Sequence, residues 1–205
     1  MLRWIKMATT DLGKNIHNAF SVVFNTYQSI EKLMCACQSD EVKQKYYLPT
    51  EKFLRYSSDQ YWEGWVYWSF ILLYQRYADG NCMENGWIDA PVYAVEINVD
   101  AETCEEPKIY IGKYEYKDIC SWIPGCSPAN HYIFYDAMHN DELFKFKSAG
   151  NVTVSVPVDE KVSGKYWGLK KVTFKEINLV DINADNYYDE IFGTIESLEN
   201  NTSDS

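Results

Sequence analysis

The apolar residues between Asp11 and Cys37 recur at intervals of three and four positions: Leu12, Ile16, Phe20, Val23, Tyr27, Ile30 and Met34. This spacing places them on one side of a helix, so the sequence predicts a long amphipathic helix with one buried stripe. A further short turn of helix is expected over 40–47, and Pro49 ends it because proline cannot continue a helix.

The next apolar segment has two interpretations. Ser57 and Gln60 have the spacing of a capping box, and Gly80 is a stop signal beyond the run that holds Trp62, Trp65 and Trp68. We therefore predict a mostly buried, aromatic helix over 58–78, packed against the rest of the domain. The same Trp, Tyr, Val and Ile content also suits a central strand, and periodicity does not separate the two for a continuous apolar run.

After Pro91 the apolar period changes to two, which is typical of strands. Residues 92–99 and 108–117 predict a hairpin joined by the acidic loop between them. Further strands are expected at 131–135, 151–158 and 171–179. In the last of these the phase of the apolar positions shifts, which indicates a bulge near Lys175.

Helical spacing returns at Tyr188, Ile191, Ile195 and Leu198, and a polar tail, expected to be frayed, follows over 199–205. Helices followed by strands without alternating crossover helices are typical of the α+β class. We expect one α+β domain over 1–198, in which a long N-terminal helix and a buried aromatic helix pack on a mainly antiparallel sheet of about five strands, with a C-terminal helix.

The composition narrows the possible functions. The 205 residues hold 19 basic and 30 acidic side chains, a formal net charge of -11, and 46% are hydrophobic. Such a chain can form a core, and its charge repels nucleic-acid backbones, so direct nucleic-acid binding is not expected. Residues 1–90 carry 9 basic and 10 acidic groups and residues 91–205 carry 10 and 20, which places the acidity in the second half.

The segment at the N-terminus, Met1–Met7, is interrupted by Arg3 and Lys6 and does not resemble a secretory signal. The longest apolar run, 65–74, is half of the roughly 20 residues that a membrane-spanning helix needs. We therefore expect a cytoplasmic protein without membrane contact, in which the six cysteines are reduced thiols.

The clearest spacing of possible metal ligands is Asp181, Asn183, Asp185 and Asp189, whose oxygen atoms alternate along a short loop. It resembles the first half of an EF-hand loop and would suit Ca²⁺ or Mg²⁺. Asn186 stands where the turn glycine is expected, and Phe192 stands where the bidentate glutamate is expected. The alternative is that Asp185 or Asn186 caps the last helix while Asn183 forms an Asx turn.

The hairpin offers a second arrangement. Glu96 or Asp100 on one strand, with Glu115 and Lys117 on the next, is the grouping by which metal-dependent nucleases hold Mg²⁺ and activate water. The alternative is the ordinary polar face of a solvent-exposed strand.

Other catalytic chemistry has little support. Cys120, Cys126, His131 and His139 could ligate Zn²⁺, but their spacings match no tight pair, and buried thiols are the preferred interpretation. Neither a nucleophile elbow nor a phosphate-binding loop occurs. His131 and His139 remain candidates for a general base.

The chain is rich in tyrosine and tryptophan, with 17 and 7 residues. We expect the tryptophans of the 58–78 run in the core, and several tyrosines that stand among charged residues at the surface: Tyr46, Tyr47, Tyr110, Tyr114, Tyr116, Tyr187 and Tyr188. Aromatic side chains with polar tips are favoured at binding surfaces. The alternative is that these tyrosines lie at the edge of the core with only their polar tips exposed.

We therefore expect a non-catalytic protein that binds a basic macromolecular partner, of the inhibitor or immunity-protein kind, and needs no cofactor. The predicted contact residues are acidic or aromatic and lie in the last helix: Tyr187, Tyr188, Asp189, Glu190 and Glu196. The alternative is a metal-dependent hydrolase or nuclease that uses the hairpin carboxylates and Lys117. The sequence does not indicate an oligomeric state.

Overall fold

The computed structural model describes residues 9–101, 105–122 and 126–200. The chain divides into two compact units, one up to Gln38 and one from Ser39 onward. The first unit holds α1 (Thr9–Ala36), which confirms the predicted N-terminal helix.

The apolar stripe of α1 is not buried along its N-terminal half. Leu12, Ile16 and Phe20 are 39%, 51% and 56% exposed. The expected burial of these three side chains is wrong, because in the described part of this unit no second helix or strand packs on them.

The second unit is built on a seven-stranded sheet in which every neighbouring pair is antiparallel. In spatial order its strands are β1 (Tyr46–Tyr47), β2 (Ser69–Arg76), β5 (Val92–Asn98), β6 (Lys108–Tyr116), β9 (Leu169–Asn178), β8 (Val152–Pro157) and β7 (Phe144–Ala149). A separate small hairpin joins β3 (Met83–Glu84) to β4 (Trp87–Ile88). The α+β class is confirmed, with two more strands in the sheet than expected: β1, β2 and β7 were not predicted as strands, and the strand predicted over 131–135 does not form.

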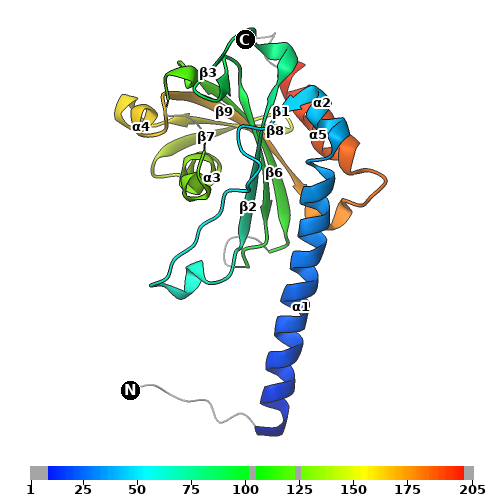
Figure 1. Cartoon of the computed structure of the whole chain (residues 1–205). Coiled ribbons are helices and arrows are strands. Elements are labelled where there is room, and N and C mark those ends of the chain that lie inside the picture. Colours follow the sequence, from blue (N-terminus) through cyan, green and yellow to red (C-terminus); the bar gives the residue numbers. More distant parts are fainter. Residues whose placement is uncertain (1–8, 102–104, 123–125, 201–205) are drawn as a thin grey trace. The chain divides into compact units, whose positions relative to one another are not determined.

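Helices cover both faces of this sheet (Figure 1). On one face, α3 (His131–His139) and α4 (Glu160–Lys165) contribute Phe134, Met138 and Val162 to the core. On the other, α2 (Asp40–Lys45) lies beside α5 (Tyr187–Asn200), and the ring of Phe192 packs on Tyr74 of β2 at 5.5 Å. Single 3₁₀ turns occupy Trp62–Gly64, Tyr77–Asp79, Ile119–Ser121, Pro128–Asn130 and Leu179–Asp181.

The central hairpin, β5 with β6, is confirmed with Glu96 paired to Tyr110. The strands predicted near 151–158 and 171–179 also form. The bulge lies elsewhere, however: Glu115 pairs with Lys171 and Tyr116 with Leu169, so Lys170 is the extra residue, rather than a residue near Lys175.

The aromatic helix predicted over 58–78 does not form. Residues 69–76 are β2, which pairs with β5, and the residues before it form a loop with one 3₁₀ turn. Of the two interpretations, the strand is correct for the second half of the run. Cross-strand pairing with β5 outweighs the local capping signal, as tertiary context often does for short apolar runs.

The strand predicted over 131–135 is a helix, α3. Ser127 accepts a hydrogen bond from the backbone of Ala129, and Asn130 accepts one from the backbone of Ser127, which makes a capping box around Pro128. This box starts a helical turn that α3 continues, so the local signal lay just before the segment that was assigned to a strand.

The predicted C-terminal helix is confirmed as α5, which includes Glu199 and Asn200. The rest of the predicted tail, 201–205, lies outside the described residues. Among the described residues, no helix is long and apolar enough to cross a membrane. The described cysteines are free thiols: Cys35, Cys37, Cys82, Cys120 and Cys126.

Candidate binding cavity

Residues 55–68, here called the tryptophan loop, connect Leu54 to the start of β2. Ser58 fixes the loop, because its hydroxyl oxygen accepts hydrogen bonds from the backbone nitrogens of Gln60 and Tyr61, at 3.2 and 3.1 Å. The carbonyl of Gly64 accepts a bond from the Ser58 nitrogen at 3.3 Å, which closes the loop on itself. The loop therefore has a defined conformation although it belongs to no strand or long helix.

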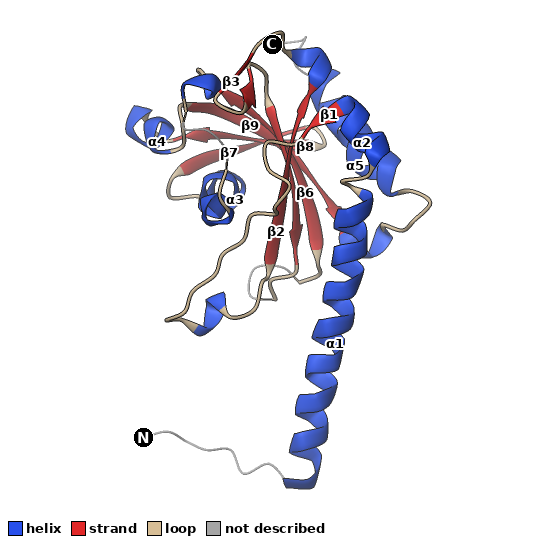
Figure 2. Cartoon of the chain, viewed as in Figure 1, coloured by secondary structure: helices blue, strands red, loops and turns tan. Residues whose placement is uncertain are grey.

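The tryptophan loop runs outward from β2 and carries its single helical turn, Trp62–Gly64, at its outer end (Figure 2). Tyr61, Trp62 and Trp65 on it are 61%, 62% and 68% exposed. The expectation that the tryptophans of this run form the core is wrong for Trp62 and Trp65, because the chain here is a loop without a sheet face to pack against. Exposed, ordered tryptophans are typical of binding surfaces.

Beside this loop lies a cavity of about 380 Å³, here called the tryptophan cavity. Its apolar lining comes from Trp62, Val66, Trp68, Val99 and Ala101. Glu63 and Asp100 also line it and are acidic, and none of the described residues that line the cavity is basic. The cavity thus combines aromatic walls with negative charge.

Trp68 is the wall residue that reaches toward the core. Its ring meets His131 and Tyr135 of α3 edge-on, with ring centroids 5.6 and 5.1 Å apart. Nε2 of His131 lies 2.9 Å from the hydroxyl oxygen of Ser69, and that hydroxyl donates to Oε1 of Glu96 at 2.8 Å. Because the single hydroxyl proton goes to Glu96, the imidazole is the donor toward Ser69.

Glu96 is the centre of this buried network and is 0% exposed. Asn98 donates to its Oε1 at 3.1 Å, and Nε2 of His139 lies 2.7 Å from its Oε2. Burial lowers the pKa of His131 to about 4, although the charge of Glu96 opposes this shift and His139 adds to it. At neutral pH the imidazole of His131 is therefore uncharged.

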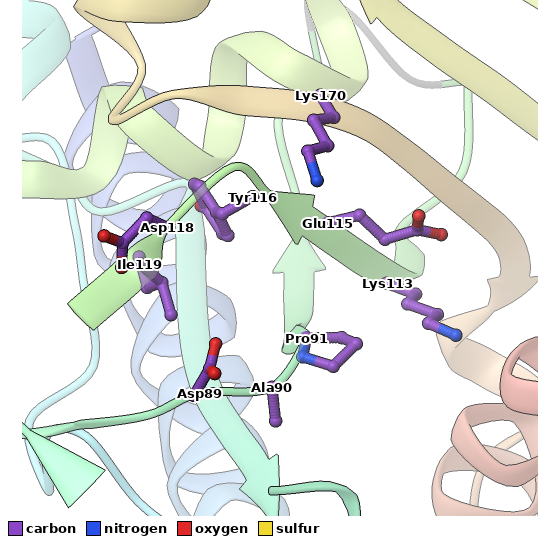
Figure 3. Close-up of a pocket in the computed structure, with 9 residues that line it drawn as sticks. All are labelled: Asp89, Ala90, Pro91, Lys113, Glu115, Tyr116, Asp118, Ile119 and Lys170. Carbon is purple, nitrogen blue, oxygen red and sulfur yellow. The ribbon is translucent and has the colours of Figure 1, made fainter. Parts of the chain in front are cut away.

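A second cavity, of about 340 Å³, lies at the opposite end of β6 (Figure 3). Its charged lining residues already have partners in several cases: Lys113 lies 2.5 Å from Glu199, Glu115 lies 3.1 Å from Lys171, and Asp118 accepts a bond from the Ser121 backbone. Figure 3 shows Lys113 and Glu115 pointing to the same side, away from Asp118. Because positive and negative groups alternate around it, this cavity favours no ligand charge.

The residues of the predicted nuclease site are not brought together. Glu115 lies five positions along β6 from Tyr110, the pairing partner of Glu96, so the two carboxylates point to opposite faces of the sheet. Lys117 forms an ion pair with Glu160. Asp100 lines the tryptophan cavity instead. The hairpin charges are thus neither one site nor a solvent-exposed face, since Glu96 is enclosed.

The predicted metal loop is held by its own amides. The Asn183 side chain accepts from the Asp185 backbone at 2.9 Å, which is the expected Asx turn. Asn186 precedes α5, but its side chain bonds back to the Asn183 nitrogen and the Asp181 carbonyl rather than to the helix. Among the described residues, no three His, Cys, Asp or Glu side chains are placed to hold a metal ion, and this includes Asp181, Asp185 and Asp189.

The predicted zinc ligands are likewise separated in function. His131 and His139 contact Ser69 and Glu96, as described above, whereas Cys120 and Cys126 are buried. Burial raises the pKa of the Cys126 thiol to about 12, so it stays protonated at neutral pH. This agrees with the interpretation as buried thiols.

The predicted partner-binding residues lie on the first three turns of α5. Asp189, Glu190 and Glu196 are exposed, and Tyr187 and Tyr188 are half-buried. Tyr188 packs on Phe192 at 5.1 Å and accepts a hydrogen bond from Lys45 at 2.9 Å. The helix therefore presents an acidic surface, while Tyr188 also has a structural role.

The tyrosines expected at the surface divide in the same way. Tyr46, Tyr110 and Tyr114 are 2%, 9% and 0% exposed, so their predicted exposure is wrong. Tyr110 and Tyr114 lie on the central strand β6, which is covered on both faces, so charged sequence neighbours do not imply exposure there. The exposed aromatic surface is formed instead by Trp62 and Trp65, which were expected in the core. Ser58 and Gly64, whose hydrogen bonds close the loop, are the residues in the sequence that could have indicated a loop here.

Comparisons with protein-family models, with curated proteins and with solved structures found no match to this chain.

Proposed function

We propose that this protein binds a basic protein partner through the tryptophan loop and the cavity beside it. The observation that carries the proposal is the exposure of Trp62 and Trp65, 62% and 68%, on a loop of defined conformation. A large, rigid aromatic side chain loses little conformational entropy when a partner covers it, and tryptophan is enriched among residues that dominate binding energy.

Charge supports a basic partner. The chain has a net charge of -11, and Glu63 and Asp100, the polar side chains among the described residues that line the cavity, are both acidic. Complementary charge speeds the encounter and selects the partner, while aromatic contacts hold the complex. An inhibitor of a basic enzyme belongs to this class of function.

The acidic side of α5, with Asp189, Glu190 and Glu196, is the second surface that could meet the partner. It offers exposed charge without exposed tryptophan. We place the main contact at the tryptophan loop, and the acidic side of α5 then contributes through long-range attraction that salt screens.

The test uses a labelled 20-residue peptide rich in Arg, Lys and Tyr, and a second peptide in which Glu replaces the basic residues. We expect the basic peptide alone to bind, with an affinity that falls as salt rises. Trp62→Ala with Trp65→Ala should weaken binding at least tenfold, since loss of hot-spot residues costs about 2 kcal/mol or more. Neutralising Asp189, Glu190 and Glu196 together should weaken it only at low salt.

Equal binding of both peptides would refute the proposal. So would full affinity in the double tryptophan variant, because the complex would then rest on charge alone. A loss of binding at all salt concentrations in the α5 variant would move the main contact to that helix and would also overturn our assignment.

A further inference from the structure

We infer that the tryptophan cavity takes the guanidinium group of one arginine side chain of the partner. The inference rests on the proposed function and makes it specific: the partner must present an exposed arginine, rather than positive charge in general.

The shape of the cavity provides the first argument. Trp62 and Trp68, the last residue of the tryptophan loop, both line it, together with the aliphatic groups of Val66 and Val99. At about 380 Å³ it lies in the size range of ligand pockets. A planar cation can lie against an indole ring here while its aliphatic stem covers the valines.

Charge provides the second argument. Glu63 and Asp100 are the charged residues among those that line the cavity, and both are negative. Glu63 is exposed, whereas Asp100 is partly buried. A carboxylate beside an aromatic wall recognises a group that is flat, cationic and rich in N–H donors, which describes guanidinium.

Arginine is favoured over lysine by hydration. An ammonium group holds its water more strongly than guanidinium, so its transfer to an aromatic wall costs more. A cage for quaternary ammonium uses several aromatic faces, and this cavity has two tryptophans.

The wall is also prepared in advance. Trp68 is held edge-on by His131 and Tyr135, and His131 is held by Ser69, which is bonded to Glu96. A wall that is already ordered spares the complex the entropy of ordering it. The buried network thus positions the cavity without contacting the ligand.

The probe is N-acetyl-L-arginine N-methylamide, titrated while the indole N–H signals of the tryptophans are followed by NMR. Blocked citrulline, which has the same shape without the charge, blocked lysine and methyl glucoside are titrated in parallel. We expect arginine to move the signals of Trp62 and Trp68, and to bind about tenfold more tightly than citrulline, the size of one cation–π contact. Lysine should bind more weakly than arginine.

Two variants and two matched controls define the site. Trp62→Ala and Asp100→Asn should abolish the arginine response. Tyr77→Ala removes an exposed aromatic side chain that lies outside both the tryptophan loop and the cavity lining, and Asp59→Asn removes an exposed charge of the tryptophan loop that does not line the cavity. Both controls should bind arginine normally. Equal loss in a variant and its control would overturn the inference.

Equal affinity for arginine and citrulline, or a stronger response to methyl glucoside, would also overturn it. The proposed function fails separately. If the basic peptide binds in a tryptophan-dependent manner while blocked arginine does not, the inference is wrong and the proposed function stands. If the basic peptide does not bind, the proposed function is refuted.

Discussion

The ring of Trp68 meets the imidazole of His131 edge-on, at 5.6 Å between centroids and an interplanar angle of 88°. This contact joins an exposed cavity to a buried polar network, because His131 lies 2.9 Å from Ser69, which donates to Glu96. The position of a surface tryptophan is thereby coupled to a carboxylate inside the domain.

This coupling predicts different effects for two substitutions of His131. His131→Ala removes both the ring under Trp68 and the bond to Ser69, and should lower the free energy of unfolding by about 2–3 kcal/mol and weaken arginine binding several-fold. His131→Phe keeps an aromatic ring and should retain most of the binding. Urea unfolding and the NMR titration measure both effects, and unchanged binding in the Ala variant would contradict the coupling.

The low pKa of His131, about 4, predicts a pH dependence of stability. The ordinary pKa of histidine is about 6.5, so between pH 6.5 and 4 this imidazole is protonated in the unfolded chain and neutral in the folded chain. This contribution to stability is complete above pH 6.5, falls as the pH is lowered toward 4, and amounts to about 3 kcal/mol. Other groups of the protein also bind protons in this pH range, so the measurement is the difference in unfolding free energy between wild type and His131→Phe. The His131→Phe curve should lack the loss of stability between pH 6.5 and 4. Parallel pH curves for the two proteins would exclude it.

Glu96 predicts a large loss of stability for a single substitution. Glu96→Ala would leave Ser69, Asn98 and His139 without their common acceptor and should cost at least about 3 kcal/mol. Glu96→Gln should cost less stability but still be destabilising, because the NH₂ group of the glutamine amide would face a hydrogen-bond donor of the network. The exposed carboxylate Glu176 is the control, and Glu176→Gln should change the unfolding free energy by less than about 0.5 kcal/mol. Similar midpoints for the variants at 96 and 176 would contradict the role of the network.

Substitution of Gly64 by alanine should disrupt the conformation of the tryptophan loop. A Cβ atom at this position would lie 2.2 Å from the Ser58 nitrogen, which is backbone and cannot turn aside. Gly64→Ala should therefore expose the loop to proteolysis and abolish tryptophan-dependent peptide binding. Gly193→Ala in α5, where a Cβ would meet nothing within 4 Å, should instead stabilise the protein by about 0.5–1 kcal/mol through helix propensity. A Gly64→Ala variant with normal peptide binding would show that the loop conformation is dispensable.

The ion pair between Lys113 of β6 and Glu199 of α5 should help to hold α5 on the sheet. The two charged atoms are 2.5 Å apart, and Lys113 is 3% exposed. Glu199→Gln removes the negative charge nearest to the buried ammonium of Lys113 and should cost about 3 kcal/mol, whereas Lys113→Met with Glu199→Leu should recover much of that loss. Thermal unfolding tests this. If the double variant is less stable than Glu199→Gln, packing rather than charge dominates the contact.

The sequence by itself determined the elements whose apolar period is long and regular. The three- and four-residue spacing of α1 and α5, and the two-residue spacing of the β5–β6 hairpin, each predicted the correct element. These predictions succeed because one helix or strand face is read directly from positions that are close in the chain. The acidic side of α5 could be predicted for the same reason.

Tertiary structure decided the rest. Residues 69–76 became a strand because β5 offered a partner, which left Trp62 and Trp65 on a loop rather than in the core. Glu96 looked like one of the polar residues of a solvent-facing strand, yet α3 covers that face and brings His131 and His139 to it from positions 35 and more residues away. The local pattern of apolar and polar residues predicts which side chains share a face of a helix or strand. Only the packing of elements that are distant in the sequence determines whether that face lies in the core, at the surface or in the wall of a cavity.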